Sequence, residues 1–196
     1  MSEFYNMNTN NPYVVSYADL FNDDEVSEIL RLTEFYALEK GVVVGEQNEN
    51  KNITDNIRTS QIKWIPYNKE TEWVYLKISN EVREINKERY HFQLTGTEPI
   101  QYSEYYGSNG GKYDFHLDTV LFDKGVRKIS VSILLSSPDD YVGGDLITWS
   151  GPDFCIAERK KGRANIFPSW TLHKVNPVIS GTRKSLVLWF YGEEFK

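Results

Sequence analysis

Short stretches of alternating side chains, each closed by a turn signal, dominate the chain from Pro99 onward. Gly, Pro, Asp or Asn bounds each stretch, which is the pattern of strands joined by tight connections. Six or more such strands in succession predict two antiparallel sheets packed face to face, a double-stranded β-helix or jelly roll. The six stretches are IQYSEYY, RKISVSILLS, GGDLITW, FCIAERK, RANIFP and KSLVLWFY.

In one of these strands, residues 128–134, the sequence indicates which side chains lie on each face. Ser130 and Ser132 fall on one side and the β-branched residues between them on the other, because side chains alternate along an extended chain. A face of small hydroxyls among apolar neighbours suits the interior of a barrel that holds a ligand. We therefore expect the two serines to face a cavity.

Two amphipathic helices are predicted before the strands. The first follows an N-cap signal at Asn22, and the second spans residues 73–89 with one apolar stripe. Residues 13–15, 42–44 and 62–65 predict three further strands. The apolar helix positions are Val26, Ile29 and Leu30 in the first helix and Val74, Ile78, Val82 and Ile85 in the second.

The chain shows no internal repeat and no long linker, so we expect one domain over residues 1–196. Its class is α+β, mainly β. Residues 1–98 would supply helical and strand support, and residues 99–196 the jelly-roll core. Residues 45–56 are polar and lack periodicity, which is typical of a long loop. That loop is either a lid over a site or a surface loop without a role.

Charge and composition limit the partners. The net charge of −6 disfavours nucleic acid and anionic membranes, and no stretch approaches the roughly 18 apolar residues of a membrane span. The single cysteine, Cys155, excludes a disulfide within the chain. The N-terminal MSEFYNMNTNNP lacks the basic and apolar regions of a signal peptide. We expect a soluble protein of a reducing cytoplasm, and the oligomeric state stays open.

Two of the three histidines form a pattern typical of a metal site. His116 and Asp118 point to one side of an extended segment, because residues i and i+2 share a face. His173 lies more than fifty residues later, where a sheet closing on itself could bring it opposite the first pair. Two histidines and one carboxylate make the facial triad of non-haem Fe(II) oxygenases. The alternative is three ordinary polar residues near turns, since His-x-Asp is common by chance.

Arg183 strengthens the metal interpretation. It begins an apolar strand ten residues after His173, and a cation that faces into a barrel is costly unless it is paired. A bound dicarboxylate would pair it with bidentate geometry. The alternative is a surface cation at a strand start.

Three longer segments resemble one family, the 2-oxoglutarate/Fe(II)-dependent dioxygenases of the prolyl 4-hydroxylase-like group. QYSEYYGSNGGKYDFHLD resembles its glycine-rich turn and His-x-Asp stretch, and SSPDDYVGGDL its Gly-Gly-acid-Leu segment. FPSWTLHKVNPVISGTRKSLVLWF resembles its distal histidine, arginine and closing strand. The resemblance covers roughly residues 101–195 and extends more weakly to NIRTSQIKW and TEWVYLKI. The nearest subgroups are bacterial and phage members and the PKHD-type hydroxylases.

This resemblance implies a reaction and roles for the matching positions. Fe(II) would use 2-oxoglutarate and O2 as cosubstrates, with ascorbate as a candidate reductant, and would hydroxylate an unactivated C–H bond with release of succinate and CO2. A prolyl residue of a peptide or protein is the expected substrate. The implied residues are His116, Asp118 and His173 for the metal, Arg183, Tyr106, Ser130 and Val175 for the cosubstrate, and Tyr113, Trp189 and Arg58 for the substrate pocket.

One position departs from some relatives, and several alternatives stay open. A tyrosine that would help to hold the distal carboxylate is replaced by Leu134, so Ser130 is expected to supply the hydroxyl. Trp189 stands where nucleobase demethylases carry a second arginine, which argues against that activity; it could equally be a core aromatic. A free amino acid or another small molecule could be the substrate. A non-catalytic jelly-roll module, or one that binds sugar through its aromatics, is the remaining alternative.

Overall fold

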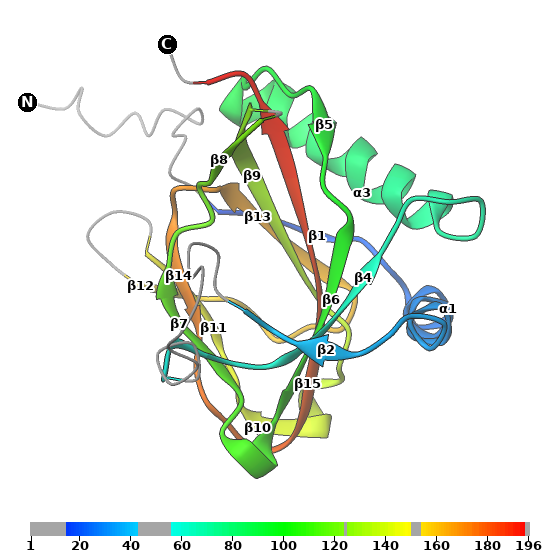
Figure 1. Cartoon of the computed structure of the whole chain (residues 1–196), viewed down its shortest axis with the longest axis vertical. Helices are drawn as coiled ribbons and strands as arrows, with labels where there is room; N and C mark the ends of the chain where they lie inside the picture. Colours follow the sequence, from blue (N-terminus) through cyan, green and yellow to red (C-terminus); the bar gives the residue numbers. More distant parts are fainter. Residues whose placement is uncertain (1–14, 43–55, 124, 150–153, 195–196) are drawn as a thin grey trace, which may run out of the picture.

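The computed structural model describes residues 15–42, 56–123, 125–149 and 154–194, which form two antiparallel sheets flanked by helices (Figure 1). The larger sheet has the order β1 (Ser16–Asp19), β13 (Arg163–Pro168), β9 (Gly125–Leu134), β15 (Val178–Gly192), β6 (Ile100–Tyr106), β4 (Gln61–Ile65) and β2 (Glu39–Lys40). Three short strands extend it: β5 (Gly96–Thr97) and β10 (Tyr141–Gly143) pair with β15, and β8 (Leu121–Phe122) pairs with β9.

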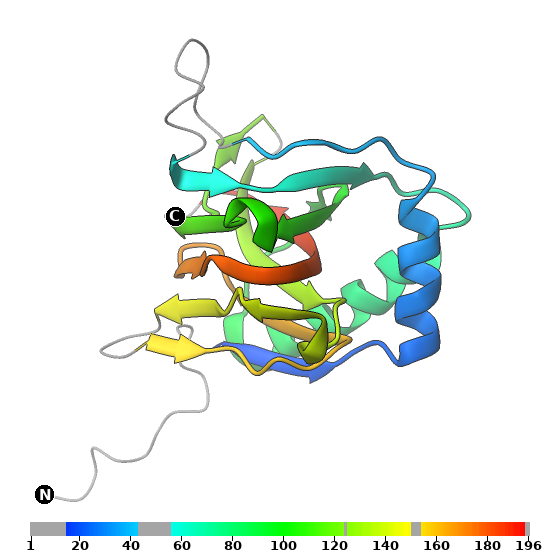
Figure 2. The same ribbon diagram turned by 90° about the horizontal axis from the view of Figure 1, so that it is seen from below.

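The smaller sheet has the order β12 (Phe154–Ile156), β11 (Leu146–Trp149), β14 (Leu172–Val175), β7 (Lys112–His116) and β3 (Arg58–Thr59). Helices α1 (Asp23–Thr33) and α3 (Glu72–Ile85) lie on the opposite side of the larger sheet from it (Figures 1 and 2). The expected jelly roll with helical support is therefore confirmed.

Helix α1 (Asp23–Thr33) begins where the sequence signal predicts. The Asn22 side chain accepts a hydrogen bond from the Glu25 amide at 2.9 Å, and the Glu25 carboxylate accepts one from the Asn22 amide at 2.9 Å. This reciprocal capping box satisfies two amides that the helix itself leaves unpaired. Val26 and Ile29 on the inner face are buried.

The second predicted helix divides into two parts. Helix α3 (Glu72–Ile85) is followed directly by a turn of π-helix, Asn86–Tyr90, which ends at His91 in the left-handed conformation. The predicted span of 73–89 is right in position, but the backbone hydrogen bonding changes within it. Tyr90 is drawn inward by this turn, and its hydroxyl donates to the carbonyl of Ile166 at 2.9 Å.

The main hydrophobic core fills the space between the helices and the larger sheet. Ile78 and Val82 of α3 are fully buried there, together with Leu186 and Leu188 of β15. Strand β9 contributes Ile129, Val131 and Ile133 to this core. Its serines alternate with them and line a cavity on the other face, as the sequence predicts.

Several short strands were not predicted, and two predicted strands differ. Strand β1 begins at Ser16, after the predicted 13–15, of which only residue 15 is described. Of the predicted strand at 42–44, only residue 42 is described, and the strand observed nearby is Glu39–Lys40. Residues 45–55 of the candidate lid also lie outside the described part of the chain. Within the described residues, no helix is long and apolar enough to cross a membrane.

Candidate metal centre

His116, Asp118 and His173 meet between the two sheets. His116 is the last residue of β7 and pairs with His173 of the neighbouring strand β14, while Asp118 lies two residues beyond His116. Each Nε2 atom lies 3.5 Å from an oxygen of the Asp118 carboxylate. One ligand atom from each of the three residues lies within 4.8 Å of the others. The sequence therefore predicted correctly that these residues converge.

Backbone carbonyls fix the tautomer of both imidazoles. Nδ1 of His116 lies 2.7 Å from the carbonyl oxygen of Asp114, and Nδ1 of His173 lies 2.9 Å from that of Thr171. A carbonyl oxygen can only accept, so each Nδ1 carries the proton and donates it. Nε2 is then the nitrogen of each ring that is left for a metal, and both Nε2 atoms face the Asp118 carboxylate.

The local electrostatics keep the site ready for a cation. Burial raises the pKa of Asp118, but the imidazoles of His173 and His116 lower it by more, so this pKa stays well below its ordinary value. Burial lowers the pKa of the His173 imidazole, against the opposing effect of the Asp118 carboxylate. One carboxylate and two imidazoles on one side of a point match the donor set of non-haem Fe(II), and three coordination positions would remain open.

A narrow inner cavity extends from this centre between the sheets. It has a volume of about 30 Å³, which is room for about two waters. His116, Asp118 and His173 lie along it, together with Ser130, Ser132 and Val175, and Arg183 lines its wall as well. Polar groups in an otherwise apolar cavity indicate a site for a small polar ligand.

Arg183 is buried, at 3% exposure, and only partly satisfied. Its Nη1 donates to Ser185 Oγ at 3.0 Å, whereas its Nε has no hydrogen-bond partner in the structure. Gly144 leaves room for the Arg183 side chain, since a Cβ at Gly144 would lie 3.1 Å from Arg183 Cδ. Its backbone φ of +66° also favours glycine at this position. Among residues 15–42, 56–123, 125–149 and 154–194, no carboxylate forms an ion pair with Arg183, and a buried guanidinium with an unsatisfied donor is the expected binding site of an anionic ligand.

Tyr105, and not the expected Tyr106, lines the inner cavity. Along β6, Gln101 and Tyr105 line the inner cavity, and Arg183 Cζ lies 5.5 Å from the Tyr105 ring centroid. Tyr106 lies on the other face of the strand, where its hydroxyl donates to Glu104. Strand alternation forces this outcome, because neighbouring residues cannot face the same cavity.

Ser130 does not lie beside Arg183. Its Oγ is 3.0 Å from Ser169 Oγ, and in the sheet register it faces Trp189, six residues along β15 from Arg183. That separation is roughly 20 Å at 3.3 Å per residue, too far for one small ligand group to contact both. Leu134, opposite Ser185, contributes no hydroxyl at the Arg183 end. Ser185 is the hydroxyl that Arg183 contacts instead.

A wider outer cavity opens on the other side of the metal centre. It has a volume of about 320 Å³ and is lined by Arg58, Trp64 and Arg127. The residues shared by the two cavities are Gln101, Tyr113, His116, Asp118 and Trp189. The Tyr113 ring stacks on the His116 ring with centroids 3.5 Å apart, so Tyr113 lies at the boundary between the inner and the outer cavity. All three expected substrate-pocket residues, Tyr113, Trp189 and Arg58, line this outer cavity.

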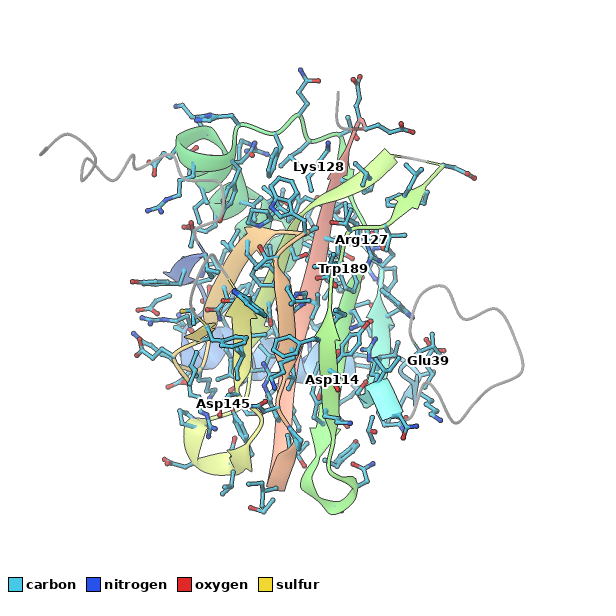
Figure 3. The ribbon with its side chains drawn as sticks, turned by 90° about the vertical axis from the view of Figure 1, so that its left-hand side faces the viewer. Glu39, Asp114, Arg127, Lys128, Asp145 and Trp189 are labelled. Atoms are coloured by element: carbon cyan, nitrogen blue, oxygen red, sulfur yellow. The ribbon has the colours of Figure 1, made fainter. Side chains whose placement is uncertain are left out.

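Trp189 is held in place by Arg127, which sequence reasoning missed. Arg127 Cζ lies 3.9 Å from the Trp189 ring centroid, and the two residues are neighbours in Figure 3. Glu98 accepts two hydrogen bonds from Arg127, at 2.5 and 2.6 Å. The Trp189 Nε1 is buried without a partner in hydrogen-bond geometry, yet it lies close enough to Asp118 to lower the pKa of that carboxyl. Trp189 is therefore a wall of both cavities rather than a core aromatic.

Comparisons with known proteins agree with this geometry. Residues 100–191 match the family described as the 2OG-Fe(II) oxygenase superfamily. A PKHD-type hydroxylase of Colwellia psychrerythraea is 42% identical over 84 residues, which are 41% of this chain and 37% of that protein. The match thus spans well under half the length of that curated relative, and the same holds for the next two.

Two solved structures share the fold over almost the whole chain. A prolyl hydroxylase from Trichoplax adhaerens, in complex with a hypoxia inducible factor peptide fragment, has a TM-score of 0.75 at 19% identity and covers 94% of this chain and 86% of its own. A Pseudomonas putida prolyl-4-hydroxylase has a TM-score of 0.67 at 25% identity, with 91% and 92% covered. The first likeness shows the fold alone.

Proposed function

We propose that this chain is a member of the 2OG-Fe(II) oxygenase superfamily, whose model matches residues 100–191, and that it hydroxylates an unactivated C–H bond of a prolyl residue in a peptide or protein. One observation supports the proposal above all others: a His-Asp-His ligand set shares its inner cavity with a buried arginine that forms no ion pair within the described part of the chain. The first part of that pair suits Fe(II), and the second suits a dicarboxylate.

His116, Asp118 and His173 would hold the iron, which with 2-oxoglutarate and O2 supplies the oxidising power for the C–H bond. Arg183 would pair with the far carboxylate of 2-oxoglutarate, with Ser185 supporting the guanidinium. Tyr105 and Val175 would form the walls around its carbon chain. The inner cavity must widen to take this cosubstrate, and Tyr113, whose ring covers His116, is placed to move.

The outer cavity is suited to an extended apolar group with polar neighbours. Trp64 and Trp189 lie with ring centroids 6.3 Å apart, and Tyr113 completes an aromatic lining. Aromatic walls pack well against a saturated ring such as that of proline. Several solved relatives with this fold are prolyl hydroxylases by name, including the one from Pseudomonas putida.

The decisive experiment is turnover with purified protein, Fe(II), ascorbate and 2-oxoglutarate. Prolyl peptides, free amino acids and lysate proteins should be offered separately, and both succinate and the mass gain of one oxygen atom should be measured. The proposal expects succinate and a hydroxylated prolyl product in equal amounts. If only free amino acids are hydroxylated, the substrate is a free amino acid and not a prolyl residue of a polypeptide. Failure to bind Fe(II) or 2-oxoglutarate would favour a non-catalytic module.

A further inference from the structure

Arg58 occupies a buried position on the wall of the outer cavity. It lies on β3, opposite Tyr113 of β7, and its exposure is 4%. Its Cζ is 4.6 Å from the Tyr113 ring centroid, and that ring stacks on His116 at 3.5 Å. These two distances limit how far the guanidinium can lie from the metal centre, so one small molecule could contact both.

The hydrogen bonds of Arg58 leave much of its guanidinium unused. Nε donates to Ser60 Oγ at 2.8 Å and Nη1 donates to the carbonyl of Val42 at 3.1 Å. Both acceptors are neutral, and Nη2 is buried with no hydrogen-bond partner among the residues that the structure describes. An arginine has five N–H donors, so the described part of the chain leaves three of them unused.

No acid among the described residues forms an ion pair with Arg58, although the cavity contains other charged groups. Glu39 lines the same cavity but is exposed and lies beyond ion-pair distance. Arg127 is already neutralised by Glu98, at 2.5 Å. A buried cation without an anion is costly, and a ligand that supplies the anion recovers that cost.

The backbone at Gly41 packs closely against the guanidinium of Arg58. A Cβ on Gly41 would lie 2.4 Å from Ser60 Oγ and 2.8 Å from Arg58 Nε. Gly41 is itself fixed, because its amide donates to the Ser60 carbonyl at 2.9 Å. The backbone therefore leaves Arg58 little freedom to turn away, which is the preorganisation expected of a binding group.

We propose that Nη2 of Arg58 binds a carboxylate of the substrate, so that the substrate carries an acid close to the carbon that is oxidised. This rests on the proposed function, because it assumes that the outer cavity receives the substrate. Two sources can supply the group: the α-carboxylate of a free amino acid, and the side chain of an Asp or Glu next to the target residue in a polypeptide.

Binding of matched acid and amide probes tests the proposal without turnover. The protein would be loaded with Mn(II) and 2-oxoglutarate under anaerobic conditions, and titrations followed by tryptophan fluorescence. One pair is L-proline against L-prolinamide; the others are blocked Glu-Pro and Pro-Glu dipeptides against their Gln counterparts. We expect the acid of at least one pair to bind about tenfold better or more, which is 1.4 kcal/mol. The pair that shows the preference identifies the source.

Variants then assign the preference to Arg58. Arg58→Gln should abolish it, Arg58→Lys should retain part of it, and Gly41→Ala should weaken it by displacing the guanidinium. Arg83→Gln, an exposed arginine of α3, is the matched control and should leave it unchanged. If Arg58→Gln fails to fold, the acid–amide comparison in the unaltered protein still shows whether the site prefers a carboxylate.

Two outcomes overturn the proposal. One is the absence of an acid preference in every pair, including no detectable binding of either member. The other is a folded Arg58→Gln variant that keeps the full preference. Failure of the proposed function has a different signature, because succinate formation or iron binding would then be missing whatever the probes show.

Discussion

Asp118 is the only anionic member of the ligand set, so its loss should be felt mainly in metal binding. Asp118→Ala leaves two imidazoles and no negative charge, and Fe(II) or Mn(II) affinity should fall by more than the roughly 10–100-fold that loss of a supporting partner costs. Anaerobic titration calorimetry measures this. Asp114→Ala is the control, because that carboxylate is exposed and only caps the Phe115 amide. Equal metal affinity in both variants would show that the ion binds elsewhere.

Arg183 should determine the affinity for 2-oxoglutarate. Arg183→Met removes the buried cation, and we expect the 2-oxoglutarate requirement to rise at least about tenfold, or 1.4 kcal/mol. The measurement is the concentration dependence of succinate formation, supported by direct binding to the Mn(II)-loaded protein. Lys184→Met, on the same strand with its side chain on the opposite face, should leave the requirement unchanged. An unchanged requirement in Arg183→Met would remove this residue from the cosubstrate site.

At the level of single residues, the sequence predicted the ligand set but not every neighbour. His116 and Asp118 follow from a two-residue spacing that any extended segment obeys. Tyr105 could have been found by the same alternation, counted from Gln101 and Ser103 along β6. Arg127 could not, because its role depends on Glu98 and Trp189, which reach it only through the register of the folded sheet.

At the level of elements, Asp19 connects the edge strand β1 to β13. Its carboxylate accepts hydrogen bonds from Arg163 at 2.7 Å and Lys160 at 2.5 Å, and these lower its pKa from 3.8 to about 2. A depressed pKa stabilises the folded state above pH 3.8, and this contribution is lost as the pH falls from 3.8 toward 2. Asp19→Asn should therefore lower the melting temperature at pH 6 but not at pH 2. A difference that is the same at both pH values would contradict this assignment.

The elements were predictable where local signals agree, and less so where they do not. Helix α1 has a capping box and an apolar stripe, so its start is specified within one turn. Strand β14 is four residues long and has two polar residues, Lys174 and the buried His173, so alternation does not single it out. It becomes a strand because β11 and β7 pair with it on both sides, which is a tertiary effect.

At the level of the whole molecule, the larger sheet separates two functions. Its outer face packs against α1 and α3 and contains most of the buried apolar surface. Its inner face, together with the smaller sheet, encloses the metal centre and both cavities. The buried arginines Arg183 and Arg58 line these cavities, where ligands would satisfy their unused donors. Stability and ligand binding should therefore be separable by mutation.

Ile78→Ala tests this separation. Ile78 of α3 is fully buried in the helix–sheet core, so its truncation should destabilise the fold by about 2–5 kcal/mol. Mn(II) with 2-oxoglutarate should raise the melting temperature of the variant as much as that of the unaltered protein, because ligand binding and a distant core change add independently. Leu76→Ala on the same helix, where the side chain is 50% exposed, should change stability by no more than about 0.5 kcal/mol. A loss of ligand stabilisation in Ile78→Ala alone would mean that the helical layer also shapes the inner cavity, through the sheet that lies between them.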